Sequence, residues 1–215
     1  ISVRDNMAIM NGGGIYMEGS SPILTNLTIS GNVADDDGGG VYIEGSSPTI
    51  INSIIWNNEP PSIIIDDDES AIISYSDIEG GWTGEGNFSE DPQITFTDDS
   101  VVMSEMSPCI DGGSKGMLPT DTYDLDFDGD ITERLPIDFL GEDRIGGLQV
   151  DVGAIEHHMP SCVGDLNADL IINVTDLLII IDYWGSTDST ADINYDGIVD
   201  ISDLLVVIGS WGPCN

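Results

Sequence analysis

The stretch GGGIYMEGSSPILTNLTISGN (residues 12–32) returns as GGGVYIEGSSPTIINSIIWNN (residues 38–58), at an offset of 26 residues. Each copy begins with a segment in which apolar residues alternate with Tyr and Glu. Because successive side chains of a strand point to opposite faces, an even offset keeps equivalent residues on the same face. We therefore expect equivalent residues of the two copies to stack, beginning with Ile15 on Val41.

This repeat also indicates a fold class. Short strands, Gly-rich corners and the absence of a helical period, at a repeat of this length, are typical of a parallel β-solenoid. Met17 would then stack on Ile43, and a looser third coil would run through Ile63–Ile65 and residues 72–78. The alternative is an antiparallel β-sandwich that contains two similar hairpins.

Three asparagines keep the same offset, Asn6, Asn32 and Asn58. We expect this column at a turn, where Asn tolerates the left-handed conformation and its amide can hydrogen-bond from coil to coil. Since the register extends back to Asn6, Ile1 is expected to fall in the middle of a coil.

Residues 1–158 resemble the C-terminal part of secreted right-handed parallel β-helix proteins of bacterial surface and polysaccharide-associated families. The motifs that carry this resemblance are SDIEGGW (76–82), EDPQI (90–94), SPCIDGG (107–113) and DVGAIE (151–156). The resemblance implies that residues 90–158 form the last coils and a cap that closes the solenoid.

A second repeat follows, in which GDLNADLIINVTDLLIIIDYWG (164–185) returns as ADINYDGIVDISDLLVVIGSWG (191–212), at an offset of 27. Each copy places oxygen-bearing side chains at positions 1, 3, 5, 9 and 12 of a twelve-residue loop, and position 7 adds a backbone carbonyl, as in an EF-hand. The predicted calcium ligands are Asp165, Asn167, Asp169, Ile171, Asn173 and Asp176, then Asp192, Asn194, Asp196, Ile198, Asp200 and Asp203. Asx-rich turns that merely cap two helices are the alternative, but they do not explain the matched positions.

An Asp at position 12, in place of the Glu of ordinary EF-hands, makes residues 164–212 similar to a type I dockerin. The resemblance implies calcium-dependent docking on a cohesin-like domain through loop positions 10 and 11. Those positions are occupied by Val174, Thr175, Ile201 and Ser202. The two hydroxyls fit the family pattern, whereas the apolar residues at position 10 depart from it.

The two loops differ at position 6, which requires a positive φ. Gly197 occupies it in the second loop and Leu170 in the first. A non-glycine residue in that conformation costs about 1 kcal/mol, so we expect the first calcium site to be weaker.

Each loop precedes an apolar segment with helical spacing. The repeated residues are Leu177, Leu178, Ile181 and Trp184, then Leu204, Leu205, Ile208 and Trp211. This spacing gives one apolar face per helix, and we expect the two faces to pack on each other.

Cys162 and Cys214 bracket the calcium-loop module and are expected to form a disulfide, which leaves Cys109 free. A module this small needs more than its own core, and a disulfide and calcium would supply it. The expected domains are residues 1–158, the β-helix coils and cap, and residues 159–215, the dockerin-like module.

The segment DLDFDGD contains a further candidate calcium site, formed by Asp124, Asp126, Asp128 and Asp130. It has the D-x-D-x-D-G form of a calcium loop, but position 12 would be Leu135. A solvated acidic turn is the alternative, so the sequence predicts two calcium ions and offers a third site.

The chain has 40 Asp and Glu against 4 Lys and Arg, a formal net charge of −36. Nucleic acid and anionic membranes would be repelled, and no apolar run is long enough to insert into a membrane. The disulfide predicts a secreted or cell-surface protein.

No catalytic constellation is recognisable, so the sequence predicts a non-catalytic structural or adhesive protein that docks with calcium. One alternative is a self-assembling filament subunit that binds another copy of itself head-to-tail through an open solenoid edge, the calcium module, or both. Another is a fragment of a polysaccharide-degrading β-helix enzyme whose catalytic coils lie upstream. The candidate partners are a cohesin-like domain, a second copy and a polysaccharide.

Overall fold

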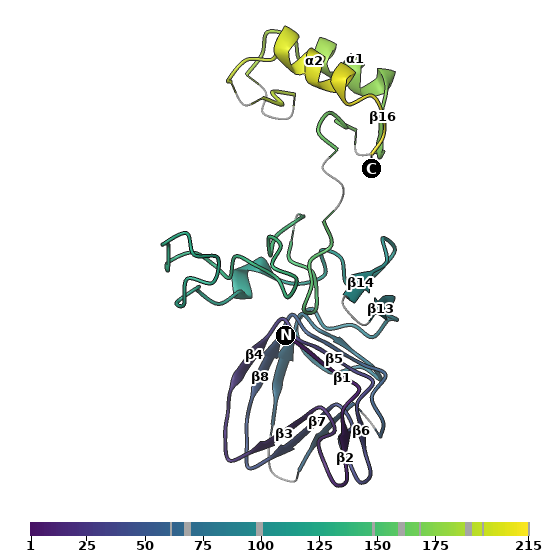
Figure 1. Ribbon diagram of the computed structural model, residues 1–215, viewed down its shortest axis with the longest axis vertical. Helices are drawn as coiled ribbons and strands as arrows, with labels where there is room; N and C mark the ends of the chain where they lie inside the picture. Colours follow the sequence, from purple (N-terminus) through teal and green to yellow (C-terminus); the bar gives the residue numbers. More distant parts are fainter. Residues whose placement is uncertain are drawn as a thin grey trace. The chain divides into compact units, whose positions relative to one another are not determined.

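A computed structural model describes residues 1–60, 62–66, 70–97, 101–147, 149–158, 162–167, 169–187, 191–194 and 196–214. The chain divides into two compact units, Ile1–His157 and His158–Asn215, and each is described by itself (Figure 1). The expected start of the second domain at residue 159 lies outside the described residues.

The first unit is a parallel β-helix whose strands form three walls around a common interior (Figure 1). The walls are β1 (Ser2–Arg4), β5 (Thr28–Ser30), β9 (Ile54–Trp56) and β12 (Asp77–Ile78); β3 (Ile15–Glu18), β7 (Val41–Glu44) and β10 (Ile63–Ile65); and β4 (Ile23–Thr25), β8 (Thr49–Ile51) and β11 (Ile72–Ser74). A shorter pair joins β2 (Met7–Ala8) to β6 (Val33–Ala34). All of these strand pairs are parallel and connect one coil to the next, which excludes the β-sandwich.

The predicted stacking is confirmed, because Ile15 pairs with Val41 and Met17 with Ile43. The third coil is confirmed as well, although it is shorter, since Val41 pairs with Ile63 at an offset of 22. The inward side chains form a core from which water is excluded. Its residues are Met17, Leu27, Ile29, Val41, Ile43, Ile50, Ile55, Ile63, Ile73 and Ile78.

The asparagine column connects the coils by side-chain hydrogen bonds, as expected. The Asn6 amide donates to Asn32 Oδ1 at 2.9 Å, and the Asn32 amide donates to Asn58 Oδ1 at 2.9 Å. The expectation of left-handed backbone at these asparagines is wrong, because the positive φ values of this turn fall one residue earlier, on Asp5 (53°), Gly31 (69°) and Asn57 (56°). Asn26 (54°) and Asn52 (50°) are left-handed at another corner. The column is therefore selected by its amide hydrogen bonds, not by its backbone conformation.

The outer face of one wall is buried too. Ile54 and Ile55 are adjacent, and neither is exposed, because Ile55 points into the solenoid and Ile54 into a second cluster outside it. Strands covered on both faces carry consecutive apolar residues. The second cluster consists of Ile54, Val101, Met103, Cys109, Val152 and Ile155.

Residues 92–157 thus lie along the outside of the coils, which differs from the expectation that they continue them. They contain an antiparallel hairpin, β13 (Ile94–Phe96) with β14 (Val101–Met103), and a 3₁₀ turn, Lys115–Met117. The Ala154 N–H donates to Thr28 Oγ1 at 2.9 Å, and the Gly153 N–H donates to the Asn52 carbonyl at 2.9 Å. Because these partners come from different coils, this segment connects successive coils laterally.

The second unit contains α1 (Val174–Asp182), α2 (Ile201–Gly209) and an antiparallel pair of two-residue strands, β15 (Ile171–Ile172) and β16 (Gly212–Pro213). Its core consists of Ile172, Ile180, Ala191, Val199 and Val207. Neither helix, nor any other described helix, is long and apolar enough to cross a bilayer.

Two buried carboxyl groups lie where residues 92–157 meet the coils. Asp77 has no exposed surface and faces the Cys109 thiol; Glu156 is 5% exposed and lies beside Arg144 and Asp151. Burial raises the pKa of both carboxyl groups to about 7. In the unfolded chain both would ionise near pH 4.

The first unit is therefore expected to lose stability as the pH rises from about 4 to about 7, because only the folded state keeps these two protons in that range. The urea midpoint, followed by the methyl signals of Ile29 and Ile55, should fall across this window. In the variant D77N/E156Q this fall should be smaller than in the control E105Q, which removes an exposed carboxylate that acts on neither group. Equal slopes in the two variants would contradict the assignment.

Candidate metal centres and docking surface

The first C-terminal loop is bent by hydrogen bonds to its own oxygen-bearing side chains. Asp165 Oδ2 accepts from the Leu170 N–H at 2.7 Å, Asn167 Oδ1 from the Asp169 N–H at 3.0 Å, and Asp169 Oδ1 from the Ile171 N–H at 2.9 Å. These bonds curl positions 1 to 7 into the tight turn that a calcium loop requires.

The second loop repeats this pattern at the offset of 27. Asp192 Oδ2 accepts from the Gly197 N–H at 2.9 Å, Asn194 Oδ1 from the Asp196 N–H at 2.9 Å, and Asp196 Oδ1 from the Ile198 N–H at 3.1 Å. Position 6 has a positive φ in both loops, 64° at Leu170 and 94° at Gly197. Leu170 therefore has the left-handed conformation that was expected at this position.

Position 12 of each loop is a fully buried carboxylate. Asp176 and Asp203 have no exposed surface. Asp203 accepts from the N–H groups of Ile193 (2.8 Å), Asn194 (3.1 Å) and Asp200 (2.8 Å). Burial acts to raise the pKa of Asp203, but these N–H donors outweigh it and hold the pKa below its ordinary value. An ionised, buried Asp203 is suited to a cation.

The same carboxylates fix the start of each helix. Asn173 caps α1 by accepting from the Thr175 N–H, and Asp176 accepts from the Asn173 N–H, which completes a capping box. Asp200 and Asp203 do the same for α2. Positions 9 and 12 therefore couple loop geometry to helix formation.

Residues 162–214 contain no Lys or Arg. Two carboxylates are buried in this module without a basic residue of the module to balance them, and burying an unpaired charge is costly. No three carboxylates within either loop lie within 4.8 Å of one another among the described residues. The donor set is thus a mixture of carboxylate, amide and carbonyl oxygens, which suits a hard divalent cation such as calcium.

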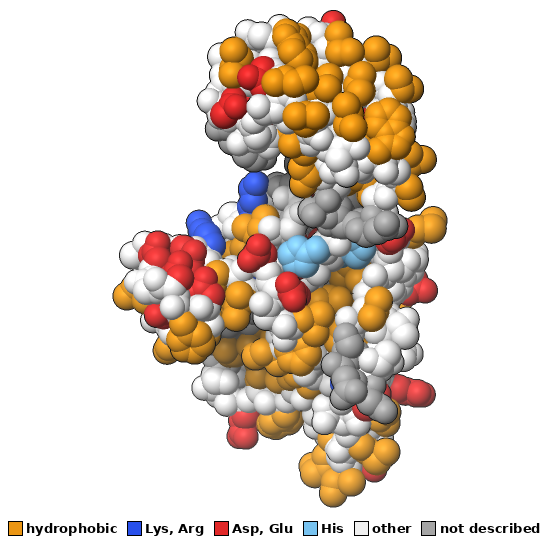
Figure 2. Space-filling model, turned by 45° about the horizontal axis from the view of Figure 1, so that its top comes forward, with side chains coloured by type: hydrophobic (Ala, Val, Ile, Leu, Met, Phe, Trp, Pro, Cys, Tyr) orange, Lys and Arg blue, Asp and Glu red, His pale blue; other side chains and the backbone are white. Residues whose placement is uncertain are grey.

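The helix faces do not pack on each other as expected. The module core is contacted by Leu177 and Leu204, whereas Leu178 (55% exposed), Leu205 (58%) and their neighbours face outward. We call the exposed residues of the two helices the docking stripes: Val174, Leu178 and Ile181 on α1, and Ile201, Leu205 and Ile208 on α2. Figure 2 shows hydrophobic side chains gathered over this module.

The four residues predicted at positions 10 and 11 have two different environments. Val174 and Ile201 are exposed and begin the docking stripes. Thr175 instead contacts the first loop, where its hydroxyl accepts from the Asn167 amide at 2.9 Å. The Ser202 N–H donates to Asp200 Oδ1 at 2.7 Å within the cap.

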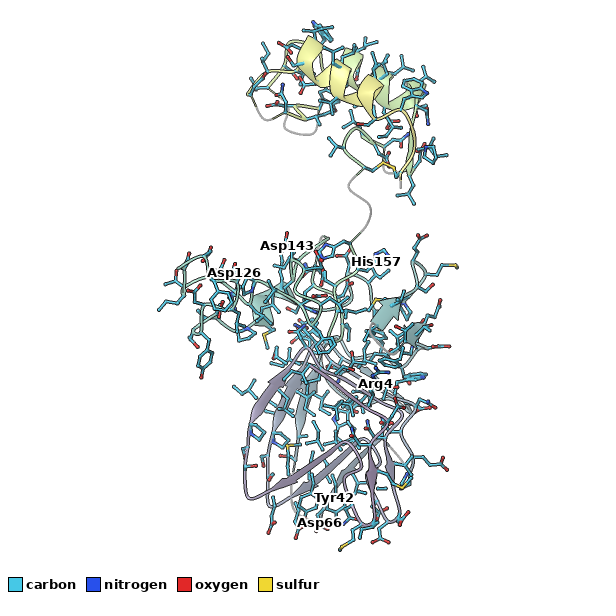
Figure 3. All side chains as sticks on the ribbon, in the orientation of Figure 1. Arg4, Tyr42, Asp66, Asp126, Asp143 and His157 are labelled. Carbon is cyan, nitrogen blue, oxygen red and sulfur yellow. A yellow bond between two sulfur atoms is a disulfide. The ribbon has the colours of Figure 1, made fainter. Side chains whose placement is uncertain are left out.

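A third acidic loop, in the first unit, has the hydrogen bonds of the two C-terminal loops. Asp124 Oδ1 accepts from the Gly129 N–H (3.1 Å), Asp126 Oδ1 from the Asp128 N–H (3.3 Å), and Asp128 Oδ1 from the Asp130 N–H (2.7 Å). Gly129 has the positive φ of position 6, at 90°. Figure 3 labels Asp126 in this loop.

The structure brings more carboxylates to this third loop than the sequence predicted. Asp124, Asp126 and Asp128 place one oxygen each within 4.8 Å of one another, and so do Asp121, Asp126 and Glu133. Sequence reasoning missed Asp121 and Glu133 because it examined position 12 only. The signal was the two acidic residues that flank the motif, which an antiparallel contact between Thr120 and Arg134 brings together.

Two residues of this loop behave differently. Asp130 Oδ1 accepts from the backbone and the hydroxyl of Thr132 and belongs to neither group of three. Glu133 Oε1 is buried without a hydrogen-bond partner. Burial and the charges of the neighbouring aspartates raise the pKa of Glu133.

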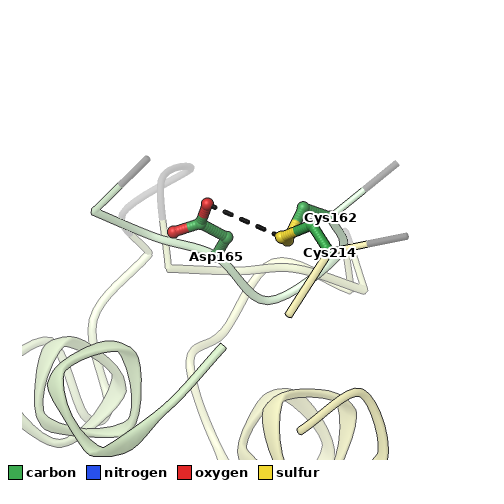
Figure 4. A group of neighbouring side chains, drawn as sticks. All are labelled: Cys162, Asp165 and Cys214. Carbon is green, nitrogen blue, oxygen red and sulfur yellow. Dashed lines mark hydrogen bonds between the residues drawn. A yellow bond between two sulfur atoms is a disulfide. The ribbon is translucent and has the colours of Figure 1, made fainter. Parts of the chain in front are cut away.

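Cys162 and Cys214 form a disulfide with their Cα atoms 5.3 Å apart (Figure 4). Cys214 Sγ lies 3.9 Å from Asp165 Oδ2. A disulfide sulfur carries no hydrogen, so this is a packing contact next to position 1 of the first loop. Cys109 is a buried free thiol.

Comparison with protein families agrees with this architecture. Residues 2–119 match the right-handed β-helix region, and residues 163–210 match the type I dockerin domain. The chain therefore belongs to the right-handed β-helix family and carries a C-terminal type I dockerin domain. Dockerin domains of this type bind calcium and dock on cohesin domains, typically in extracellular or cell-surface proteins. No curated protein and no solved structure shows a significant match.

Removal of calcium with EDTA is expected to unfold the dockerin domain, because its buried carboxylates then lack a counter-charge. The far-UV circular dichroism of the helices should decrease, and the thermal transition of the dockerin domain should disappear. The variant D196N, which removes one loop charge, should need more calcium to refold, whereas D182N, outside the loops, should not. An unchanged spectrum and melting curve in EDTA would refute the prediction.

Proposed function

We propose that this chain is an extracellular, non-catalytic structural or adhesive protein that is attached to a cohesin-like domain through its calcium-loaded dockerin domain. The observation that carries the proposal is the pair of docking stripes beside the two calcium loops. Six apolar side chains at helical spacing are about half exposed there, although each helix also contributes residues to the module core.

An exposed apolar surface of this kind supports binding of another protein. The stripes begin at loop position 10, so calcium, by fixing positions 9 and 12, would also fix Val174 and Ile201 in place. Calcium dependence then follows from the structure of the caps. We propose two ions in the dockerin domain, at the ligands that the sequence predicts.

The β-helix supports a structural role. Arg144 is 1% exposed and donates to the carbonyls of Asp151 and Gly153. Arg4 lies over the Phe96 ring and donates to the Thr97 carbonyl, and Arg134 donates to the Leu118 carbonyl. The arginines that could serve an acidic polysaccharide substrate are thus engaged in packing.

The disulfide supports an oxidising, extracellular location. We place the boundary between the two domains at residues 158–159, as the sequence suggests.

Docking is expected to depend on the stripes and only weakly on salt. The variant V174D/I201D should bind a cohesin domain at least about tenfold more weakly, a loss of about 1.4 kcal/mol. An acidic residue in the first turn of a helix is favourable, so this variant should fold. Calorimetry at low and high salt measures both effects.

I23D is the matched control, since Ile23 is 74% exposed on β4, outside the dockerin domain. It should bind the cohesin like the parent protein. Unchanged binding of V174D/I201D, with an intact calcium response, would show that the stripes are not the docking surface.

We also propose that the acidic loop around Asp126 binds a third calcium ion. Its hydrogen bonds match those of the dockerin loops, and Asp121 and Glu133 add carboxylates that partly replace the missing position 12. An ion there would offset the mutual repulsion of these carboxylates.

Calcium titration of the full chain is therefore expected to show three ions, and two in the variant D126N/E133Q. The control D143N, which removes a carboxylate outside both groups, should retain three. A stoichiometry of two in the parent protein would eliminate this third site and leave the dockerin sites untouched.

A further inference from the structure

The two dockerin loops differ in the residue at position 6, and a disulfide is hydrogen-bonded to the first loop only. Leu170 has a φ of 64° where Gly197 has 94°. Glycine adopts a positive φ without the steric cost that a Cβ atom imposes on other residues. The disulfide is also specific to the first loop. At the offset of 27, the residues equivalent to Cys162 and Cys214 are Ser189 and Thr187, which cannot form a disulfide.

The disulfide closes a ring through the first loop. The Asp165 N–H donates to the Cys162 carbonyl at 2.9 Å, and the Cys214 N–H donates to the Leu170 carbonyl at 3.0 Å. The Leu170 N–H in turn donates to Asp165 Oδ2 at 2.7 Å. The two half-cystines are therefore hydrogen-bonded through their backbones to positions 1 and 6, the first residue of the loop and the residue at its turn.

The strand next to the disulfide does not by itself distinguish the loops. β16 pairs Gly212 with Ile172. The second loop has a corresponding ladder, in which the Gly185 N–H donates to the Val199 carbonyl and the Val199 N–H to the Ser186 carbonyl. The covalent connection is what remains specific to the first loop.

We propose that Cys162 and Cys214 are positioning residues of the first calcium site. The disulfide holds Leu170 in its left-handed conformation through the Cys214 N–H and places Asp165 through the Cys162 carbonyl. It thereby compensates the first loop for the glycine that it lacks. The inference rests on the proposed calcium binding of the dockerin domain.

A site-resolved calcium titration of the full chain tests this proposal. The amide signals of Leu170 and Gly197 report the two loops in ¹⁵N-resolved spectra. In the variant C162S/C214S the dissociation constant of the first loop should rise at least about fivefold, about 1 kcal/mol. The second loop should change by less than about twofold, well under that energy.

Equal weakening of the two loops would overturn the proposal, because the disulfide would then only support the fold of the domain. Unchanged affinity of the first loop would overturn it as well. Absence of calcium binding in the parent protein is a separate result, since it refutes the proposed function before any cysteine is changed.

The substitution L170G provides a second, independent measurement. Glycine removes the cost of the positive φ, so the first loop should depend less on the disulfide. Within the L170G background, the substitutions C162S/C214S should weaken the first site by less than half of the fold-change seen with Leu170. The same fold-change in both backgrounds would show that the disulfide does not act through position 6.

Discussion

The dockerin domain depends on two carboxylates, Asp176 and Asp203, that are buried without any basic residue in their module. Each accepts backbone N–H groups of its loop and also completes the cap of the following helix. A divalent cation would satisfy each carboxylate, keep the caps and hold the helix at its first turn, so the proposed calcium binding makes metal binding and folding of this module one process.

This constraint explains why the helices are organised as they are. Only one apolar residue per helix, Ile180 in α1 and Val207 in α2, is fully buried in the module core, and the docking stripes remain outside. A module of this size cannot bury every apolar side chain of two short helices. The proposed calcium ions and the disulfide would provide the stability that a larger core gives, and the apolar surface that remains exposed supports the proposed docking.

The sequence predicted most of what depends on repetition. Equal offsets placed Ile15 on Val41, aligned the asparagine column and matched the two calcium loops position by position, because each of these follows from register alone. Prediction from the sequence failed where the outcome depends on three-dimensional packing. Nothing in the spacing of Leu177 and Leu178 says which one faces the core, and Asp121 and Glu133 are joined only by a chain reversal. The left-handed residues of this turn were misplaced by one position, since Asp5, Gly31 and Asn57 precede the asparagine column and the repeat alone does not show which residue of a turn takes that conformation.

The β-helix faces the opposite difficulty from the dockerin domain, because stacking equal coils also stacks equal charges. Glu18 pairs directly with Glu44, and like charges opposite each other on a sheet repel. The neighbouring column offsets this repulsion. Tyr16 stacks on Tyr42 with ring centroids 5.5 Å apart, and its hydroxyl donates to Glu44.

That hydrogen bond raises the pKa of Tyr16 to about 12, so the hydroxyl remains a donor throughout the physiological range. In the next coil Ile64 pairs with Tyr42, so the tyrosine column ends there. The Asp66 N–H donates to the Ile43 carbonyl, so Asp66 follows Glu44 in the acidic column (Figure 3 labels Tyr42 and Asp66). With four Lys and Arg in the whole chain, neutral donors must do most of what cations do in other proteins. These neutral donors are the amides of the asparagine column, the phenols of the outer wall and the backbone N–H groups of the two dockerin loops.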